Sequence, residues 1–208
     1  MKKALFWLII VGIGVGVGFG LRSSHAENAT QQVLSANTSY NTSTNQDPVA
    51  PTTAPQAVSG TPVHISIPKI NVDTQVESVG MDSKGRMDVP KNADNTAWFS
   101  PGFRPGVNGS AVIDGHYDKV TGAPAVFYKL KDLTAGDNII ITDNNGTKYT
   151  FAVDRVVPYP DDNFPIKEVF AAAAVPQLNL ITCDGTWNKE THNYSNRMVV
   201  YSKLVSHT

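Results

Sequence analysis

Cysteine is almost absent from this chain of 208 residues, in which Cys183 stands alone. A disulfide within the chain is therefore excluded, and a packed core has to stabilise the fold. Exported proteins usually carry cysteines in pairs, because an oxidising environment favours disulfides. In an exported chain, an unpaired thiol indicates a reactive group or an intermolecular bridge. Cys183 is therefore the first candidate nucleophile of the sequence.

A long basic block is absent too, and the 17 Lys and Arg residues nearly balance the 18 Asp and Glu residues. The formal net charge of -1 leaves no row of cations to neutralise phosphates, which argues against nucleic-acid binding. No segment keeps a 3.6-residue hydrophobic period over several turns, which argues against a helical bundle or a βαβ fold. The hydrophobic content of 41% suits one domain of ordinary size with appended segments.

One long hydrophobic run is present near the N-terminus. Ala4 to Leu21 contains no charged residue and reaches roughly 27 Å as a helix, close to the thickness of the bilayer's hydrocarbon core. We expect residues 1–22 to form an uncleaved membrane anchor. Lys2 and Lys3 hold the N-terminus in the cytoplasm, which makes the chain a single-pass protein of the cell membrane with an extracellular domain. The alternative is a signal peptide cleaved after its small-x-small pattern, Ser24 to Ala26.

Residues 23–60 consist mainly of Ser, Thr, Asn, Gln, Ala and Pro. Such a segment cannot bury enough apolar surface to offset the loss of chain entropy, and we interpret it as a flexible linker. From Thr61 onward, short β-prone runs alternate with Gly, Pro, Asn and Asp. The sequence thus predicts three parts, namely an anchor over residues 1–22, a linker over residues 23–60 and a folded domain over residues 61–208.

The folded domain is predicted to be all-β. Seven runs rich in Val, Ile, Thr, Tyr and Phe are typical of strands, namely Val63–Ile67, Gln75–Val79, Ser110–Ile113, Asn138–Thr142, Lys148–Val157, Asn179–Thr182 and Met198–Leu204. Asp143 to Gly146 tolerates positive φ and predicts a hairpin from Asn138 to Val157. The longest helix-compatible stretch, Lys167 to Val175, lies between Pro165 and Pro176. Short strands without long helices predict a sandwich or a barrel.

A histidine is the natural acid-base partner of a thiol, and three histidines remain as candidates once His25 in the linker and His207 next to the C-terminus are set aside. His116 follows Gly115 where an apolar strand ends in a polar loop, which is a common way to present a catalytic base. His64 alternates with apolar neighbours and is expected on the polar face of its strand. His192 lies in a hydrophilic stretch after Cys183 and is the second candidate base.

Arg197 begins the last strong strand of the sequence. Its separation from Cys183 allows the two strands to be neighbours, which would bring the guanidinium beside the thiol. The guanidinium is permanently charged, so it can stabilise a thiolate or a developing oxyanion without a proton transfer. Arg197 is therefore the third candidate site residue.

In order and spacing, these motifs resemble the sortase family of membrane-anchored cysteine transpeptidases. Ile181-Thr182-Cys183 corresponds to the family's Thr-Cys strand, Gly115-His116 to its histidine motif, and Asn196-Arg197-Met198-Val199-Val200 to its arginine motif. His116-Tyr117-Asp118, with the residues from Gly122 to Phe127, is most similar to class F sortases. The resemblance covers nearly the whole folded domain. It implies a closed eight-stranded β-barrel with short helices and loops, and an active site in a groove at one end.

The resemblance also implies a chemistry. Cys183 would attack a carbonyl of a C-terminal sorting signal of the Leu-Pro-x-Thr-Gly kind and form a thioacyl enzyme. His116 would protonate the leaving amine and deprotonate the incoming one, while Arg197 and the backbone around Thr182 would stabilise the oxyanion. The partners would be proteins with a sorting signal, and the acceptor an amine of peptidoglycan or its precursor in a Gram-positive wall. No metal or other cofactor is implied.

The sequence leaves several alternatives open. Water could resolve the acyl enzyme, which would make the protein a hydrolytic cysteine peptidase, or the chain could be a non-catalytic anchored β-domain that binds cell-wall polymer, with an inert buried thiol. Cys183 and His116 could rest as an ion pair or as a neutral pair. Asp184 could repel a thiolate or bind a substrate amine. Asp161 and Asp162 do not form a calcium site by themselves.

Overall fold

The structure, a computed structural model, describes residues 59–208 and shows a closed β-barrel. The strands are β1 (Pro62–Ile67), β2 (Val72–Val79), β3 (Thr96–Phe99), β4 (Gly109–Gly115), β5 (Asn138–Asp143), β6 (Lys148–Pro160), β7 (Pro176–Asn188) and β8 (Asn193–His207). The short helices are η1 (Pro68–Ile70), η2 (Leu130–Asp132), η3 (Asp161–Asn163) and α1 (Ile166–Val169). The predicted all-β, eight-stranded barrel is confirmed.

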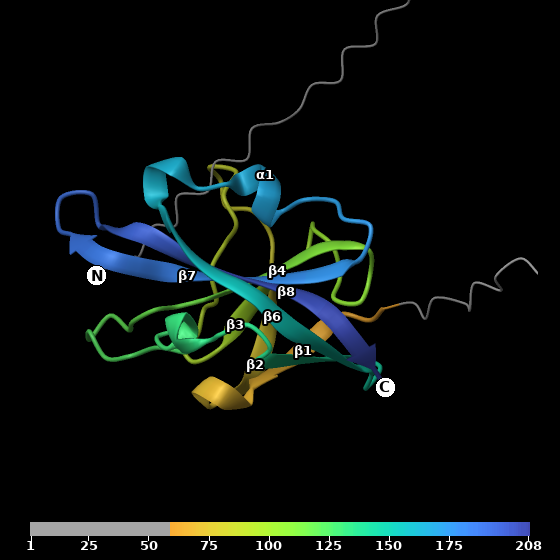
Figure 1. Ribbon diagram of the computed structural model, residues 1–208. Helices are drawn as coiled ribbons and strands as arrows, with labels where there is room; N and C mark the ends of the chain where they lie inside the picture. Colours follow the sequence, from red (N-terminus) through yellow and green to blue (C-terminus); the bar gives the residue numbers. More distant parts are fainter. Residues whose placement is uncertain (1–58) are drawn as a thin grey trace, which may run out of the picture. The chain divides into compact units, whose positions relative to one another are not determined.

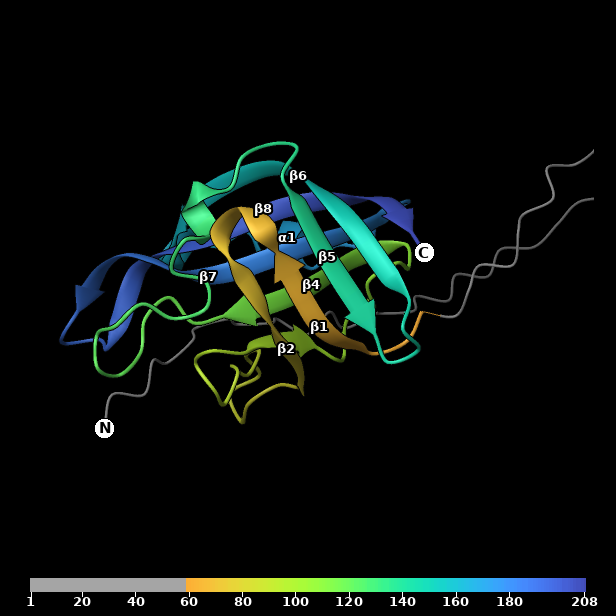
Figure 2. The ribbon, with the colours of Figure 1, turned by 90° about the horizontal axis from the view of Figure 1, so that it is seen from below.

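The strands follow one another around the barrel in the order β1-β2-β3-β4-β7-β8-β6-β5, and β5 pairs with β1 to close it. The pairs β2–β3 and β4–β7 are parallel, and the other pairs are antiparallel. Figure 1 shows the long strands β6, β7 and β8 together. Figure 2 shows β1, β2 and β5 in another part of the wall. In this order β4, β7 and β8 are consecutive, and these strands carry or precede the three candidate site residues.

The described chain begins beside the β5–β6 turn, where the amide of Gly60 donates to the carboxylate of Asp143 at 2.8 Å. The predicted anchor over residues 1–22 and the predicted linker as far as residue 58 lie outside the described residues. Within residues 59–208, no helix is long and apolar enough to cross a membrane.

All seven runs predicted as strands lie within strands of the barrel. The hairpin from Asn138 to Val157 is confirmed, and Gly146 adopts a φ of 84° in its turn. The sequence did not reveal β3, which is only four residues long and follows a polar stretch. Its four residues are all buried, because Trp98 packs in the barrel interior while Ala97 and Phe99 pack on the opposite face of the strand.

The helix predicted for Lys167 to Val175 is wrong in its length, since α1 ends at Val169. The ring of Phe170 packs edge-on against the ring of Phe99, with 5.4 Å between their centroids. The carbonyl of Ala171 then accepts a hydrogen bond from the amide of Ser110 at 3.0 Å. This carbonyl turns towards β4 instead of along a helix axis. Packing on the barrel therefore overrides the local helical preference.

The barrel strands bury two hydrophobic clusters on opposite faces. The inner cluster fills the barrel with residues from every strand, including Ile65, Ile113, Ile141, Phe151 and Leu180. The outer cluster lies on the other face of β3, β4, β7 and β8 and contains Val112, Val169, Ile181, Cys183 and Val199. Both faces of β4 are therefore buried along its whole length. Figure 1 shows α1 over this region, and the side-chain amide of Asn179 in β7 donates to the carbonyl of Val169 at 2.6 Å.

Candidate active site

The predicted site residues belong to three consecutive strands of the barrel or directly follow one of them. Cys183 in β7 lies directly opposite Arg197 in β8, as an antiparallel register pair. β4 lies on the other side of β7, and His116 follows its last residue. Opposed residues of paired strands project from the same face of a sheet, so the expectation that the strands of Cys183 and Arg197 are neighbours is confirmed.

Cys183 is buried, with 6% of its surface exposed. Burial raises the pKa of the thiol to about 12, because a low-polarity environment disfavours the thiolate. The charge of Arg197 lowers this pKa, while Asp114, Asp118 and Asp161 raise it further. At neutral pH this pKa favours a protonated resting thiol. Of the two arrangements considered for Cys183 and His116, it favours the neutral pair over the ion pair.

His116 is held by its own hydrogen bond and by its neighbours. Its Nε2 lies 3.0 Å from the carbonyl oxygen of Pro90. A carbonyl only accepts hydrogen bonds, so Nε2 carries a proton and Nδ1 is the nitrogen left to exchange one. Phe127 donates its amide to the carbonyl of His116 at 3.0 Å, and its ring packs so closely on Gly115 that a Cβ there would lie 2.5 Å from it. Glycine at position 115 is required by this close approach.

Thr182 links the strand of the thiol to the strand of the histidine. Its hydroxyl donates to the carbonyl of Gly115 at 2.7 Å, and its side chain is buried. Side chains alternate along a strand, so Thr182 projects from the face opposite to Cys183. The hydroxyl therefore supports the spacing of β4 and β7, while any contribution of Thr182 to an oxyanion site would come from its backbone.

The guanidinium of Arg197 is fully buried, with 1% of the residue exposed. Its Nη2 contacts the carboxylate of Asp161 at 2.9 Å and the side-chain oxygen of Asn193 at 2.7 Å. Its Nη1 donates to the backbone carbonyls of Asn196 at 2.9 Å and Tyr194 at 3.3 Å. A buried cation needs such an anion and such acceptors to offset the loss of hydration.

Asp114 is a buried carboxyl group of the site that the sequence analysis did not single out. It lies in β4 opposite Ile181 of β7, so it shares a face with Cys183 two positions further along. Burial raises the pKa of Asp114 to about 8, although Arg197 and the amide of Gly115 lower it. The sequence could have indicated Asp114, because the two-residue alternation of a strand puts residue 114 on the same face as residue 116, the candidate histidine.

We predict that Asp114 makes the stability of the domain pH-dependent. Between the unfolded pKa of about 3.9 and the folded pKa of about 8, the native state holds a proton that the unfolded state has lost. The free energy of unfolding should therefore fall as the pH rises through this window, by up to about 1.4 kcal/mol per pH unit. Asp114→Asn mimics the neutral acid and should remove this contribution. Urea denaturation of both proteins from pH 4 to pH 9 measures the difference, and parallel curves would contradict the prediction.

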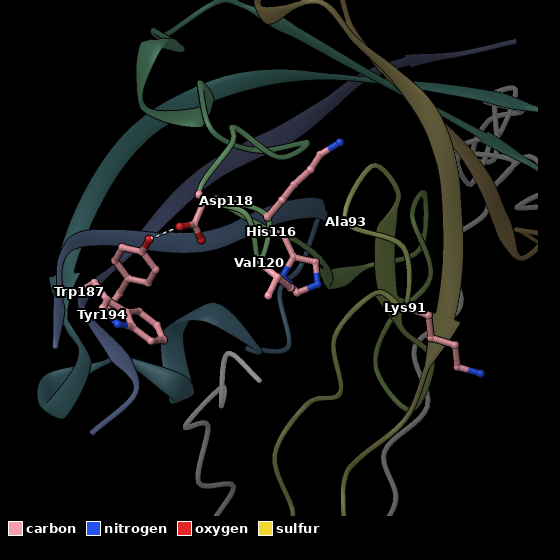
Figure 3. Close-up of a pocket in the computed structure, with 9 residues that line it drawn as sticks. Lys91, Ala93, His116, Asp118, Val120, Trp187 and Tyr194 are labelled. Carbon is pink, nitrogen blue, oxygen red and sulfur yellow. Dashed lines mark hydrogen bonds between the residues drawn. The ribbon is translucent and has the colours of Figure 1, made fainter. Parts of the chain in front are cut away.

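A cavity of about 320 Å³ opens beside His116. Figure 3 shows His116 on one side of it and Trp187 and Tyr194 on another, with the Tyr194 hydroxyl donating to Asp118 at 2.6 Å. Further residues on its wall are Lys91, Ala93, Lys119, Val120 and Gly122. Small molecules from solution can reach the imidazole of His116 through this cavity, whereas Cys183 is buried.

The other sequence candidates lie elsewhere. His64 contacts Asp73 through Nε2 at 2.6 Å, between β1 and β2 and away from the thiol strand. His192 lies in the exposed β7–β8 turn, where its ring faces Trp187 at 6.4 Å. In residues 59–208, no group of three or more His, Cys, Asp or Glu side chains is arranged to hold a metal ion. The carboxylate of Asp161, which was considered for a calcium site, instead forms an ion pair with Arg197.

A closed barrel with a cysteine in register with an arginine, and a histidine that follows the strand next to the cysteine, is the arrangement of a cysteine enzyme built on a β-barrel. The family model described as the sortase domain matches residues 65–205. The chain therefore belongs to the sortase family and is a sortase-type cysteine transpeptidase. No curated protein matches the sequence.

Solved sortase structures have the same fold. Sortase A of Listeria monocytogenes is 18% identical with a TM-score of 0.54, over 70% of this chain and 87% of that one. Sortase A of Corynebacterium diphtheriae is 21% identical with a TM-score of 0.53, over 71% of this chain and 62% of that one. Sortase C-1 of Actinomyces oris is 18% identical with a TM-score of 0.55, over 69% of this chain and 71% of that one. At such low identity, these structures support the fold alone.

Proposed function

We propose that Cys183 is the nucleophile of a transpeptidase that acts on proteins with a C-terminal sorting signal of the Leu-Pro-x-Thr-Gly kind. The observation that carries this proposal is the register pairing of Cys183 in β7 with Arg197 in β8, with β7 lying next to β4, the strand that His116 follows. The sulfur attacks a backbone carbonyl of the signal, and the C–N bond breaks to leave a thioacyl enzyme and a free amine.

His116 would carry the protons of both half-reactions through Nδ1, since Nε2 is bound to Pro90. The resting thiol is neutral, so its proton passes to the imidazole as the sulfur attacks. The imidazolium then protonates the leaving amine. In the second half-reaction, the neutral imidazole takes a proton from the acceptor amine as that amine attacks the thioester. The C–S bond then breaks, and the released sulfur takes this proton from the imidazolium, which restores the neutral thiol.

Arg197, with the backbone around Thr182, would stabilise the negative oxygen of each tetrahedral intermediate. The guanidinium is buried, on a residue that lies opposite Cys183 in the barrel wall, and an ionic interaction is stronger in such an environment than in water. Its charge also favours the thiolate that forms during the attack.

The acceptor would be an amine of peptidoglycan or of its precursor, reaching His116 through the cavity beside it. The location we propose is the outer side of the cell membrane, with residues 1–22 as the anchor. The uncharged run from Ala4 to Leu21 and the lysines before it support this location. The residues from His116 to Phe127 support a place in class F of the family.

Mass spectrometry of the protein incubated with sorting-signal peptides tests the proposed function. We expect a covalent adduct on Cys183 whose mass is that of the N-terminal part of the peptide. Addition of triglycine should convert the adduct into a new peptide faster than water hydrolyses it. An equal yield of hydrolysis with and without triglycine would favour the hydrolytic peptidase, and the absence of any adduct would contradict the proposed nucleophile.

A further inference from the structure

Asp161, Asn193 and Arg197 form a closed set of contacts next to the thiol, which we call the arginine clamp. Nη2 of Arg197 contacts both Asp161 at 2.9 Å and the side-chain oxygen of Asn193 at 2.7 Å. The side-chain amide of Asn193 donates to the second oxygen of Asp161 at 2.5 Å. Each of the three side chains therefore contacts the other two.

The clamp connects two separate parts of the barrel. Asp161 begins η3, at the start of the connection that runs from β6 through α1 to β7. Asn193 is the first residue of β8, the strand of Arg197. An arginine side chain has several rotatable bonds, so the position of its Cα opposite Cys183 does not by itself determine where the guanidinium lies. The contacts to Asp161 and Asn193 hold Nη2, while Nη1 is held by backbone carbonyls of β8 itself.

The carboxylate of Asp161 does not serve to activate the thiol of Cys183. The negative charge of Asp161 raises the pKa of Cys183 and so disfavours the thiolate. A partly buried carboxylate is also costly in itself, and burial raises the pKa of Asp161 despite the nearby Arg197 and Asn193. Any benefit of Asp161 therefore has to come from its contact with Arg197.

We propose that Asp161 is a positioning residue that, together with Asn193, holds the guanidinium of Arg197 in place to receive the oxyanion at Cys183. This role rests on the proposed function, in which Arg197 stabilises that oxyanion. The carboxylate supplies the counter-charge that the buried guanidinium requires, and the amide of Asn193 holds the carboxylate in turn. The connection from β6 to β7 thereby determines the geometry of the oxyanion site.

Asp161→Asn tests the proposal, with Asp162→Asn as the matched control. The two variants remove the same charge from adjacent residues, but Asp162 is exposed and is not part of the clamp. We expect Asp161→Asn to lower kcat for a sorting-signal peptide and triglycine by up to about 10²-fold, with little change in KM, because the guanidinium is misplaced. The rate of Cys183 alkylation by iodoacetamide at pH 7 should increase, because the thiol pKa falls. Asp162→Asn should match the wild-type protein in both measurements.

An Arg197→Ala background separates positioning from a general structural role. In that background, Asp161→Asn should cause no further loss of turnover, because the group that it positions is missing. An equal loss in both backgrounds, unchanged or increased turnover of Asp161→Asn alone, or slower alkylation would overturn the positioning role. If the wild-type protein forms no acyl adduct on Cys183, the proposed function fails and this role with it. If the adduct forms and Asp161→Asn behaves like Asp162→Asn, only the positioning role fails.

Discussion

Replacing Cys183 with alanine is expected to abolish transpeptidation, with a loss of at least about 10⁴-fold in kcat/KM. The thiol is the only sulfur nucleophile of the sequence, and water attack on the sorting signal would have to proceed without a covalent intermediate. Turnover of a fluorogenic sorting-signal peptide with triglycine measures the effect. The acyl adduct seen by mass spectrometry should disappear together with the turnover.

The fold should tolerate this replacement. Cys183 lies in the outer hydrophobic cluster, where alanine leaves only the space of one sulfur atom. The expected loss in the free energy of unfolding is about 1 kcal/mol, so a thermal unfolding curve distinguishes inactivation from unfolding. A folded Cys183→Ala protein that still transfers the peptide to triglycine would contradict the assignment of the nucleophile.

Replacing Arg197 with alanine is expected to lower kcat by about 10²- to 10³-fold, the usual effect of removing one oxyanion donor. Arg197→Lys should recover only part of the loss, since an ammonium keeps the charge but not the planar fork that contacts Asp161 and Asn193. The separate measurement of kcat and KM checks the role, because a group that acts on the oxyanion changes mainly kcat.

The domain should remain folded without Arg197. Asp161, its ionic partner, is partly exposed, so water can reach the carboxylate once the guanidinium is gone. Some stability is lost because Asn193 also loses its partner. Far-ultraviolet circular dichroism and the unfolding midpoint provide the control. A kcat close to that of the wild-type protein in a folded Arg197→Ala variant would show that Arg197 does not stabilise the oxyanion.

Strand patterns in the sequence predicted most of the barrel, and the exceptions show where such patterns fail. The alternation of Val63 to Ile67 is visible locally, because one face of β1 lines the barrel interior. β3 carries no alternation, because both its faces are covered by other parts of the chain. The alanines after α1 favour a helix, but the packing of Phe170 on Phe99 ends it.

The candidate site also has a part that the sequence predicted and a part that only the structure revealed. Cys183, His116 and Arg197 were identified by residue type and motif. The structure pairs Cys183 with Arg197 in register and puts His116 directly after the strand next to that of Cys183. Asp114 and the arginine clamp were not identified, although Asp161 was considered as part of a calcium site. Whether a carboxyl group is neutral or paired depends on its depth and on its neighbours, which a linear pattern does not report.

By itself, the sequence determined the all-β class of the protein, its resemblance to sortases and the identity of its three candidate site residues, because these depend on residue type and local order. Only the tertiary structure decided that Cys183 lies opposite Arg197 in register, that burial raises the pKa of the thiol, and that Asp161 contacts the guanidinium. The physical reason is that burial and ionic interactions depend on distances through space, and the residues that set them here are far apart along the chain.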